Sequence, residues 1–97
     1  MRKIKVSLQP IVKNIDLPTV LKTAIIPGDS SESLFIATQV GRIFYISNGA
    51  INTFLDIRSQ VIELGTSNGG YDERGLLCLA FHSEFYYNGL FYLHYSV

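Results

Sequence analysis

The sequence predicts an all-β protein that begins with an antiparallel four-stranded meander. Ile, Val, Phe, Tyr and Thr cluster in short runs, and Gly, Asn, Asp and Pro separate these runs. The connections between the early runs are short, and part of the pattern recurs when the chain is shifted by 56 residues. The chain has 97 residues and 47% hydrophobic content, so we expect a single small globular domain.

Four runs make up the predicted meander, and each of the three connections has a turn signal. The first connection, residues 27–32, contains Pro, Gly, Asp and Ser, and the second is Val40-Gly41. The third is Asn48-Gly49, a pair that tolerates the positive φ angles of a tight hairpin. The predicted strands are Leu21 to Ile26, Leu34 to Gln39, Arg42 to Ser47 and Ile51 to Leu55.

The internal repeat indicates a β-propeller, because a four-stranded meander is the unit of that fold. Under the 56-residue shift, four residues coincide with identical ones: Leu21, Ala24, Leu34 and Phe35 fall on Leu77, Ala80, Leu90 and Phe91. The second unit supplies predicted strands over residues 75–82 and 90–96. We therefore expect a first blade over residues 16–56, an inter-blade loop over 57–75 and the start of a second blade over 76–97.

A blade and a half cannot close a ring, since propellers need about four to eight blades. We expect residues 1–97 to be the N-terminal fragment of a larger propeller, whether by gene truncation, by gene splitting or by the choice of the residues expressed. The last strand would then leave an unpaired hydrophobic edge, and self-association would follow from it. The alternative is a complete small β-sandwich or barrel.

The composition argues against several classes of function. Eight basic and eight acidic side chains give a formal net charge of zero and are scattered singly, so nucleic acid is not an expected partner. No apolar run has the length of a membrane span, and no export signal is visible near Met1. The single cysteine, Cys78, lies in an apolar run, and we expect it to be a small buried hydrophobe.

The segment from Asp72 to His82 reads D-E-R-G-L-L-C-L-A-F-H, and Asn88-Gly89 and an aromatic strand follow it. This order resembles the signature of the glucose/sorbosone dehydrogenase family, which are six-bladed propeller quinoproteins, and of their Hedgehog-interacting-protein-like relatives. The resemblance covers roughly residues 38–96. It departs at Cys78, where the family usually has Gly, and at Ser83, where it usually has Pro.

The resemblance implies a cofactor contact at Glu73, because the matching family residue is typically a Gln beside pyrroloquinoline quinone. Arg74 is the second candidate cofactor-binding residue. An ionised carboxylate only accepts hydrogen bonds and repels a cofactor that carries carboxylates, so Glu73 weakens this expectation. The structural alternative for residues 72–74 is a loop with a local ion pair, or an Arg74 that braces neighbouring carbonyl groups.

We assign no catalytic residue and no metal site. His82 matches a turn histidine of the family and is expected to be a hydrogen-bonded structural residue. His94 adds no third ligand, so the two histidines do not make a metal site. The six Tyr and six Phe are expected to pack between blades, with the Tyr hydroxyl groups reaching water.

Three functions remain open. The resemblance implies a fragment of a quinone-dependent aldose dehydrogenase that uses pyrroloquinoline quinone and calcium on a sugar substrate, with the catalytic His in later blades. Such a fragment would be inactive by itself, and the remaining blades would be its partner. The alternatives are a fragment of a non-catalytic propeller that binds a protein or glycan, and a self-associating small β module. Family members are often periplasmic or secreted, but this sequence itself leaves the localisation open.

Overall fold

The computed structural model is built from strands, with one short helix near its C-terminal end, and describes residues 3–65 and 72–97. Four strands form one antiparallel sheet in the order β1-β2-β3-β4, and two more form an antiparallel hairpin. Their bounds are β1 Pro18–Ala24, β2 Ser33–Thr38, β3 Arg42–Ser47, β4 Ala50–Asp56, β5 Leu76–Phe81 and β6 Phe91–Tyr95, with helix α1 Phe85–Asn88 between β5 and β6. The all-β meander followed by the first strands of a second unit is confirmed, and it is consistent with a propeller fragment.

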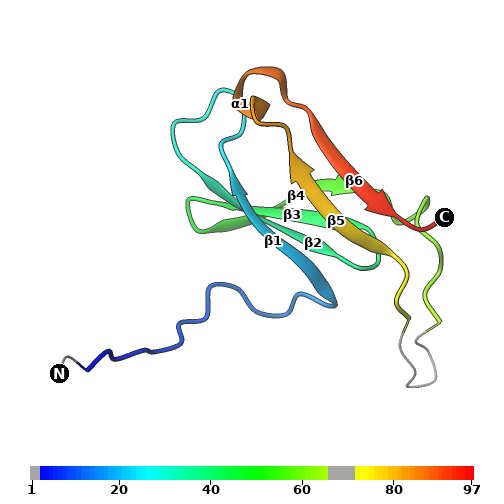
Figure 1. Cartoon of the computed structure of the whole chain (residues 1–97), viewed down its shortest axis with the longest axis horizontal. Helices are drawn as coiled ribbons and strands as arrows, with labels where there is room; N and C mark the ends of the chain where they lie inside the picture. Colours follow the sequence, from blue (N-terminus) through cyan, green and yellow to red (C-terminus); the bar gives the residue numbers. More distant parts are fainter. Residues whose placement is uncertain (1–2, 66–71) are drawn as a thin grey trace.

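The β5–β6 hairpin lies across one face of the four-stranded sheet, and α1 sits at one end of the hairpin (Figure 1). We call this sheet face the covered face and the opposite one the open face. Side chains alternate between the faces along each strand. On β2, Phe35 and Ala37 are fully buried against the hairpin residues Leu76 and Leu79, and Ile43 of β3 completes this cluster.

Aromatic rings make up much of the core between the sheet and the hairpin. The Phe35 ring lies 5.0 Å from that of Phe54 and 4.8 Å from that of Phe81, both edge to face. Phe54 in turn lies 5.2 Å from Phe91 of β6, and Phe81 lies 4.6 Å from Phe85 of α1. These contacts bear out the expected packing role of the Phe side chains.

The tight turns follow from their residues. Asn48 and Gly49 have φ values of 52° and 76°, the pair of positive angles that a type I′ hairpin turn requires. At the β2–β3 turn, the Gly41 N–H donates to the Thr38 carbonyl at 3.1 Å, and the Thr38 hydroxyl lies 2.9 Å from the Arg42 carbonyl. Both connections therefore lie where the sequence places them.

The first strand was misplaced by the sequence pattern. It begins at Pro18 rather than Leu21 and ends at Ala24, so Ile25 and Ile26 lie outside it. The early start is stabilised by Thr19, whose hydroxyl donates to the Leu76 carbonyl at 3.0 Å and to the Ala37 carbonyl at 3.3 Å. Helix α1 was also missed.

The expectation of a buried Cys78 was wrong. Cys78 is exposed, because a register irregularity between Leu76 and Cys78 places it on the side of the hairpin that faces away from the sheet. Its cross-strand partner there is His94. The buried positions of β5 are Leu76 and Leu79.

Candidate functional site

The candidate site is the turn from Asp72 to Gly75 that leads into β5. It lies at the same end of the molecule as the β2–β3 turn, because Gln39 connects the two. The Gln39 carboxamide donates to the backbone carbonyls of Asp72 and of Arg74, the latter at 2.7 Å. The Gln39 carbonyl accepts from the Leu76 N–H at 2.8 Å. Gln39, the first residue after β2, therefore fixes both the turn and the start of β5.

Gly75 permits this close approach. Its φ is +120°, and a Cβ atom built on it would lie 2.5 Å from the Gln39 carbonyl oxygen. A side chain at position 75 would therefore collide with the backbone, in a conformation that L-residues rarely adopt. The fold therefore requires glycine at position 75, directly after Asp-Glu-Arg in the motif.

Asp72 and Arg74 form a bidentate ion pair. The Arg74 Nε donates to Asp72 Oδ1 at 2.9 Å and its Nη2 donates to Oδ2 at 2.7 Å. The backbone N–H groups of Arg74 and Gly65 also donate to this carboxylate, at 2.9 and 3.1 Å. These donors hold the pKa of Asp72 well below its usual range, with the Arg74 side chain making the largest contribution. The Asp72 side chain is 9% exposed and that of Arg74 is 53% exposed.

The candidate residues are thus brought together in one turn, with different environments. Glu73 is exposed, whereas Arg74 directs its guanidinium at Asp72. This is the local ion pair that the structural alternative anticipates. Cofactor contact by Glu73 and Arg74 stays a prediction. Tyr71, which precedes this turn in the sequence, lies outside the described residues.

A second Asp-x-Arg pair, which sequence reasoning missed, lies where β4 ends. Arg58 Nε donates to Asp56 Oδ1 at 2.9 Å and Nη2 donates to Oδ2 at 2.7 Å, the same bidentate geometry. The Arg58 side chain lowers the pKa of Asp56. The signal was the spacing, since Asp56 and Asp72 each precede an arginine by two residues. Both pairs stabilise chain turns that leave or enter the sheets.

His82 has the structural role expected of it. Its Nδ1 accepts from the Glu84 N–H at 3.0 Å and lies 3.0 Å from the Asn88 side-chain nitrogen. Asn88 Oδ1 accepts from the Leu90 N–H at 2.9 Å, and Gly89 ends α1 with a φ of 67°. His82 therefore organises the turn between β5 and β6.

Neither a metal cluster nor a membrane-spanning helix occurs in the part of the chain that the structure describes. Over residues 3–65 and 72–97, no three His, Cys, Asp or Glu side chains gather as metal ligands would. None of the helical structure in those ranges is long and apolar enough to cross a membrane.

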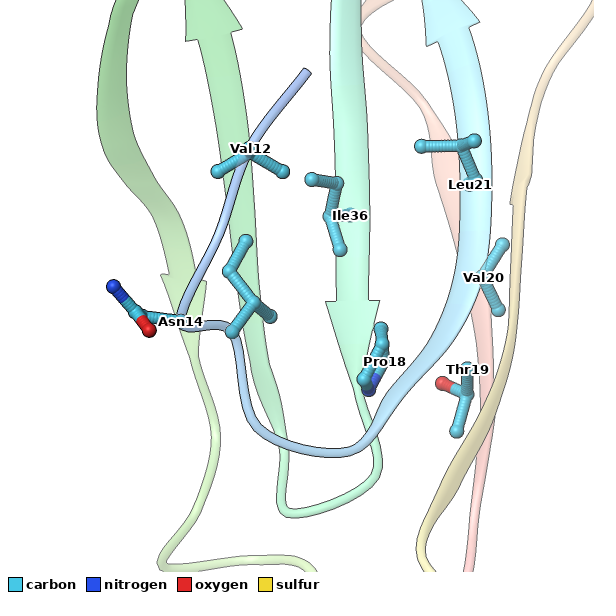
Figure 2. A pocket seen from close by; sticks show the side chains of 8 residues that line it. Val12, Asn14, Pro18, Thr19, Val20, Leu21 and Ile36 are labelled. Carbon is cyan, nitrogen blue, oxygen red and sulfur yellow. The ribbon is translucent and has the colours of Figure 1, made fainter. Parts of the chain in front are cut away.

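A groove of about 430 Å³ lies on the open face, between the segment before β1 and the first two strands. Figure 2 shows Val12 of that segment beside Ile36 of β2, with Leu21 of β1 at the other side. Ile36 is 4% exposed, whereas Leu21 remains 67% exposed. The segment before β1 therefore covers part of the open face and leaves its β1 side uncovered.

Comparison with known proteins shows a partial similarity to a curated protein. Human Hedgehog-interacting protein is 35% identical over 92 residues, a region that covers 92% of this chain and 12% of that protein. The chain thus spans about an eighth of the length of this curated relative. No family model matches the chain, and no solved structure matches it. The similarity agrees with the Hedgehog-interacting side of the resemblance, and membership of the sugar dehydrogenases stays a prediction.

Proposed function

We propose that this chain is a segment of a β-propeller whose function is recognition of a partner protein or glycan. The order of its elements supports the propeller: a four-stranded meander is followed by a hairpin that packs on it. Its similarity to Hedgehog-interacting protein supports recognition, because that relative is named for its interaction with Hedgehog. Further blades would cover the apolar side chains that remain exposed on the two outer faces, including Leu21, Ile51 and Tyr92.

The observation that carries this choice is the ion pair between Asp72 and Arg74. A quinone with several carboxylates is bound by cationic side chains that donate hydrogen bonds to it. In this structure, the Nε and Nη2 of Arg74 both donate to Asp72 instead. Glu73 adds a carboxylate beside them. The pairing of Arg74 with Asp72 argues against contact with pyrroloquinoline quinone and supports a structural role for this turn.

The second candidate is a segment of a quinone-dependent aldose dehydrogenase, which the motif from Asp72 to His82 favours. In that case Glu73 and Arg74 would contact pyrroloquinoline quinone, with calcium supplied together with the cofactor, and later blades would provide the chemistry. A sugar would be the substrate. The cofactor would then stabilise the isolated chain if Glu73 and Arg74 were already in position to bind it.

Two measurements distinguish the candidates. The first is binding of a Hedgehog signalling protein to the immobilised chain, with Hedgehog-interacting protein as the positive control. The second is the melting temperature with pyrroloquinoline quinone and calcium, with a quinoprotein glucose dehydrogenase as the control. A ligand at 100 times its Kd stabilises the folded state by about 2.7 kcal/mol, which raises the Tm of a domain this size by more than about 10 °C.

We expect saturable Hedgehog binding and an unchanged Tm with the quinone. A quinone-dependent rise in Tm without Hedgehog binding would overturn the proposal in favour of the dehydrogenase. If neither ligand acts, a glycan array tests the remaining part of the proposal, and a blank array would leave the self-associating β module as the better description.

A further inference from the structure

Another cleft lies at the end of β5 that is opposite to the turn from Asp72 to Gly75. It has a volume of about 260 Å³ and lies between the end of β1 and the turn that joins β5 to β6. Figure 1 shows α1, which belongs to this turn, close to the connection that follows β1. A Cβ atom built on Gly89 of the turn would lie 3.9 Å from Pro27 Cγ of that connection. Further propeller blades would lie against the open face and the outer face of the hairpin, so they would leave this cleft in place.

Aromatic rings line much of the cleft. Phe85 is 5% exposed, and its ring lies 4.6 Å from that of Phe81, which also lines the cleft. Tyr86 lines it as well and is 42% exposed. The volume lies below the range of about 300–1,000 Å³ that is typical of small-molecule sites, and it suits a single ring better than a cofactor. Aromatic-lined grooves of this kind bind the prolines of extended peptides.

His82 supplies a hydrogen-bond donor of fixed orientation. The Leu90 N–H donates to Asn88 Oδ1 at 2.9 Å, which turns the Asn88 amide nitrogen toward His82 Nδ1, 3.0 Å away. The Glu84 N–H donates to the same Nδ1 at 3.0 Å. Because two N–H groups are directed at Nδ1, this atom is an acceptor, and the hydrogen-bond network assigns the hydrogen of the neutral ring to Nε2. Nδ1 faces the turn, so the Nε2 edge is left to meet a ligand in the cleft that His82 lines.

A peptide carbonyl oxygen is the acceptor that fits this donor. The hydroxyl groups of Thr23 and Ser83 also line the cleft, and each can donate a further hydrogen bond. The lining that the structure describes contains no Asp, Glu, Lys or Arg. A proline residue has a carbonyl group but no backbone N–H, so it needs donors from its partner and no acceptor. The rings and the donors together therefore suit a proline-rich segment.

The surroundings of the cleft are acidic. The two segments that form it, residues 23–32 and 81–90, contain no Lys or Arg and three acidic side chains, Asp29, Glu32 and Glu84. Glu84 is exposed and lies in the sequence between two residues that line the cleft, Ser83 and Phe85. This charge attracts a basic partner and repels an acidic one.

We propose that this cleft binds a proline-rich segment of a partner protein, with a basic side chain next to the prolines. A proline ring would pack on Tyr86, a carbonyl oxygen would accept from His82 Nε2, and the basic side chain would meet Glu84. The proposal goes beyond the proposed function, because it holds whether or not the chain binds a Hedgehog protein.

The first test is binding of a labelled peptide to the full chain, measured by fluorescence anisotropy. The peptide alternates proline with leucine and has an arginine at each end. We expect saturable binding, which should be at least tenfold weaker when alanine replaces each proline and at least threefold weaker when glutamine replaces each arginine. Absence of binding, or equal binding of the alanine peptide, would overturn the proposal.

Two pairs of variants test the residues of the cleft. Tyr86→Ala should weaken binding at least tenfold, whereas Tyr92→Ala, which removes an exposed ring on β6 outside the cleft, should change it less than threefold. Glu84→Lys should weaken binding of the arginine-bearing peptide at least fivefold, whereas Glu63→Lys makes the same charge change at an exposed residue outside the cleft and should have little effect. Equal effects within either pair would contradict the proposed site.

Amide chemical shifts of the isotope-labelled native chain locate the site without any variant. The peptide should move the resonances of Ile25 and of residues 82–86, and those of residues 72–75 should stay unchanged. Shifts confined to any other region would contradict the proposal. Maltotriose is the comparison ligand, and a chain in which this neutral oligosaccharide moves the cleft resonances while the peptide does not would have a carbohydrate site there instead.

Discussion

Replacing Gly75 by alanine tests whether the close contact between β2 and β5 organises this fold. Gly75 has a φ of +120°, and the added Cβ would lie 2.5 Å from the Gln39 carbonyl oxygen and 2.8 Å from its Cγ. The same carbonyl accepts the Leu76 N–H, so it cannot move away without loss of that hydrogen bond. Both the backbone conformation and the space around it oppose the substitution.

The size of the effect follows from two contributions. A residue with a Cβ in a left-handed conformation costs about 1–2 kcal/mol. Forcing an extra methyl into a filled site costs typically about 1–3 kcal/mol. We therefore expect Gly75→Ala to lower the free energy of unfolding by about 2–5 kcal/mol, out of the roughly 5–15 kcal/mol that small domains possess.

The assay is urea unfolding followed by circular dichroism, with Gly49→Ala as the matched control. Gly49 also has a positive φ, +76°, but an added Cβ there meets nothing within 4 Å. The control should lose only the conformational part, about 1–2 kcal/mol. The difference between the two variants measures the contact with Gln39. Equal losses would refute the claim that this contact fixes the start of β5.

Three further predictions concern the site and the core. The ion pair with Arg74, followed by the Gly65 N–H, keeps the pKa of Asp72 below its ordinary value, so its contribution to stability is present above about pH 4 and is lost as the pH falls further. Asp72→Asn should therefore lower the urea midpoint at pH 7 and have a smaller effect at pH 3. His82→Ala should cost about 1 kcal/mol, because the Glu84 N–H loses its acceptor. Phe35→Ala should cost about 3–5 kcal/mol in thermal or urea unfolding, because this fully buried ring contacts other aromatic rings on several sides.

Each of these changes has a control in the same chain. Asp56→Asn removes the acid of the second bidentate pair, which is more exposed, and should have a smaller effect than Asp72→Asn. His94→Ala and Tyr87→Ala alter exposed side chains and should stay within about 0.5 kcal/mol of the native chain. A loss at His94 as large as that at His82 would contradict the turn role of His82.

The meander was predictable because its signals are local. Asn48-Gly49 has a mechanism that needs no tertiary information, and the runs that became β2, β3 and β4 are bounded by such turns. The start of β1 was not predictable in this way. Thr19 is held by the carbonyls of Ala37 and Leu76, which are distant in the sequence.

The site was only partly predictable for the same reason. An ion pair between Asp72 and Arg74 could be anticipated from their spacing, but the clamp by Gln39 joins residues more than thirty positions apart. Cys78 was misjudged because a run of apolar residues does not reveal on which side of the hairpin a register irregularity places each of them. Helix α1 was missed because its four residues contain strand-forming aromatics, and its turn depends on His82 and Asn88 side chains.

The hydrogen bond between the Gln39 carbonyl and the Leu76 N–H also affects which insertions and deletions this fold tolerates during evolution. Because β2 itself sets where β5 starts, the length of the connection after Asp56 does not decide the register between the two sheets. Lengthening such a connection costs little, about 0.6 kcal/mol for each doubling. Insertions and deletions can therefore accumulate between related proteins in the part of this connection that follows Val61 and Ile62, which are themselves packed or hydrogen-bonded, while the strands on either side keep their alignment.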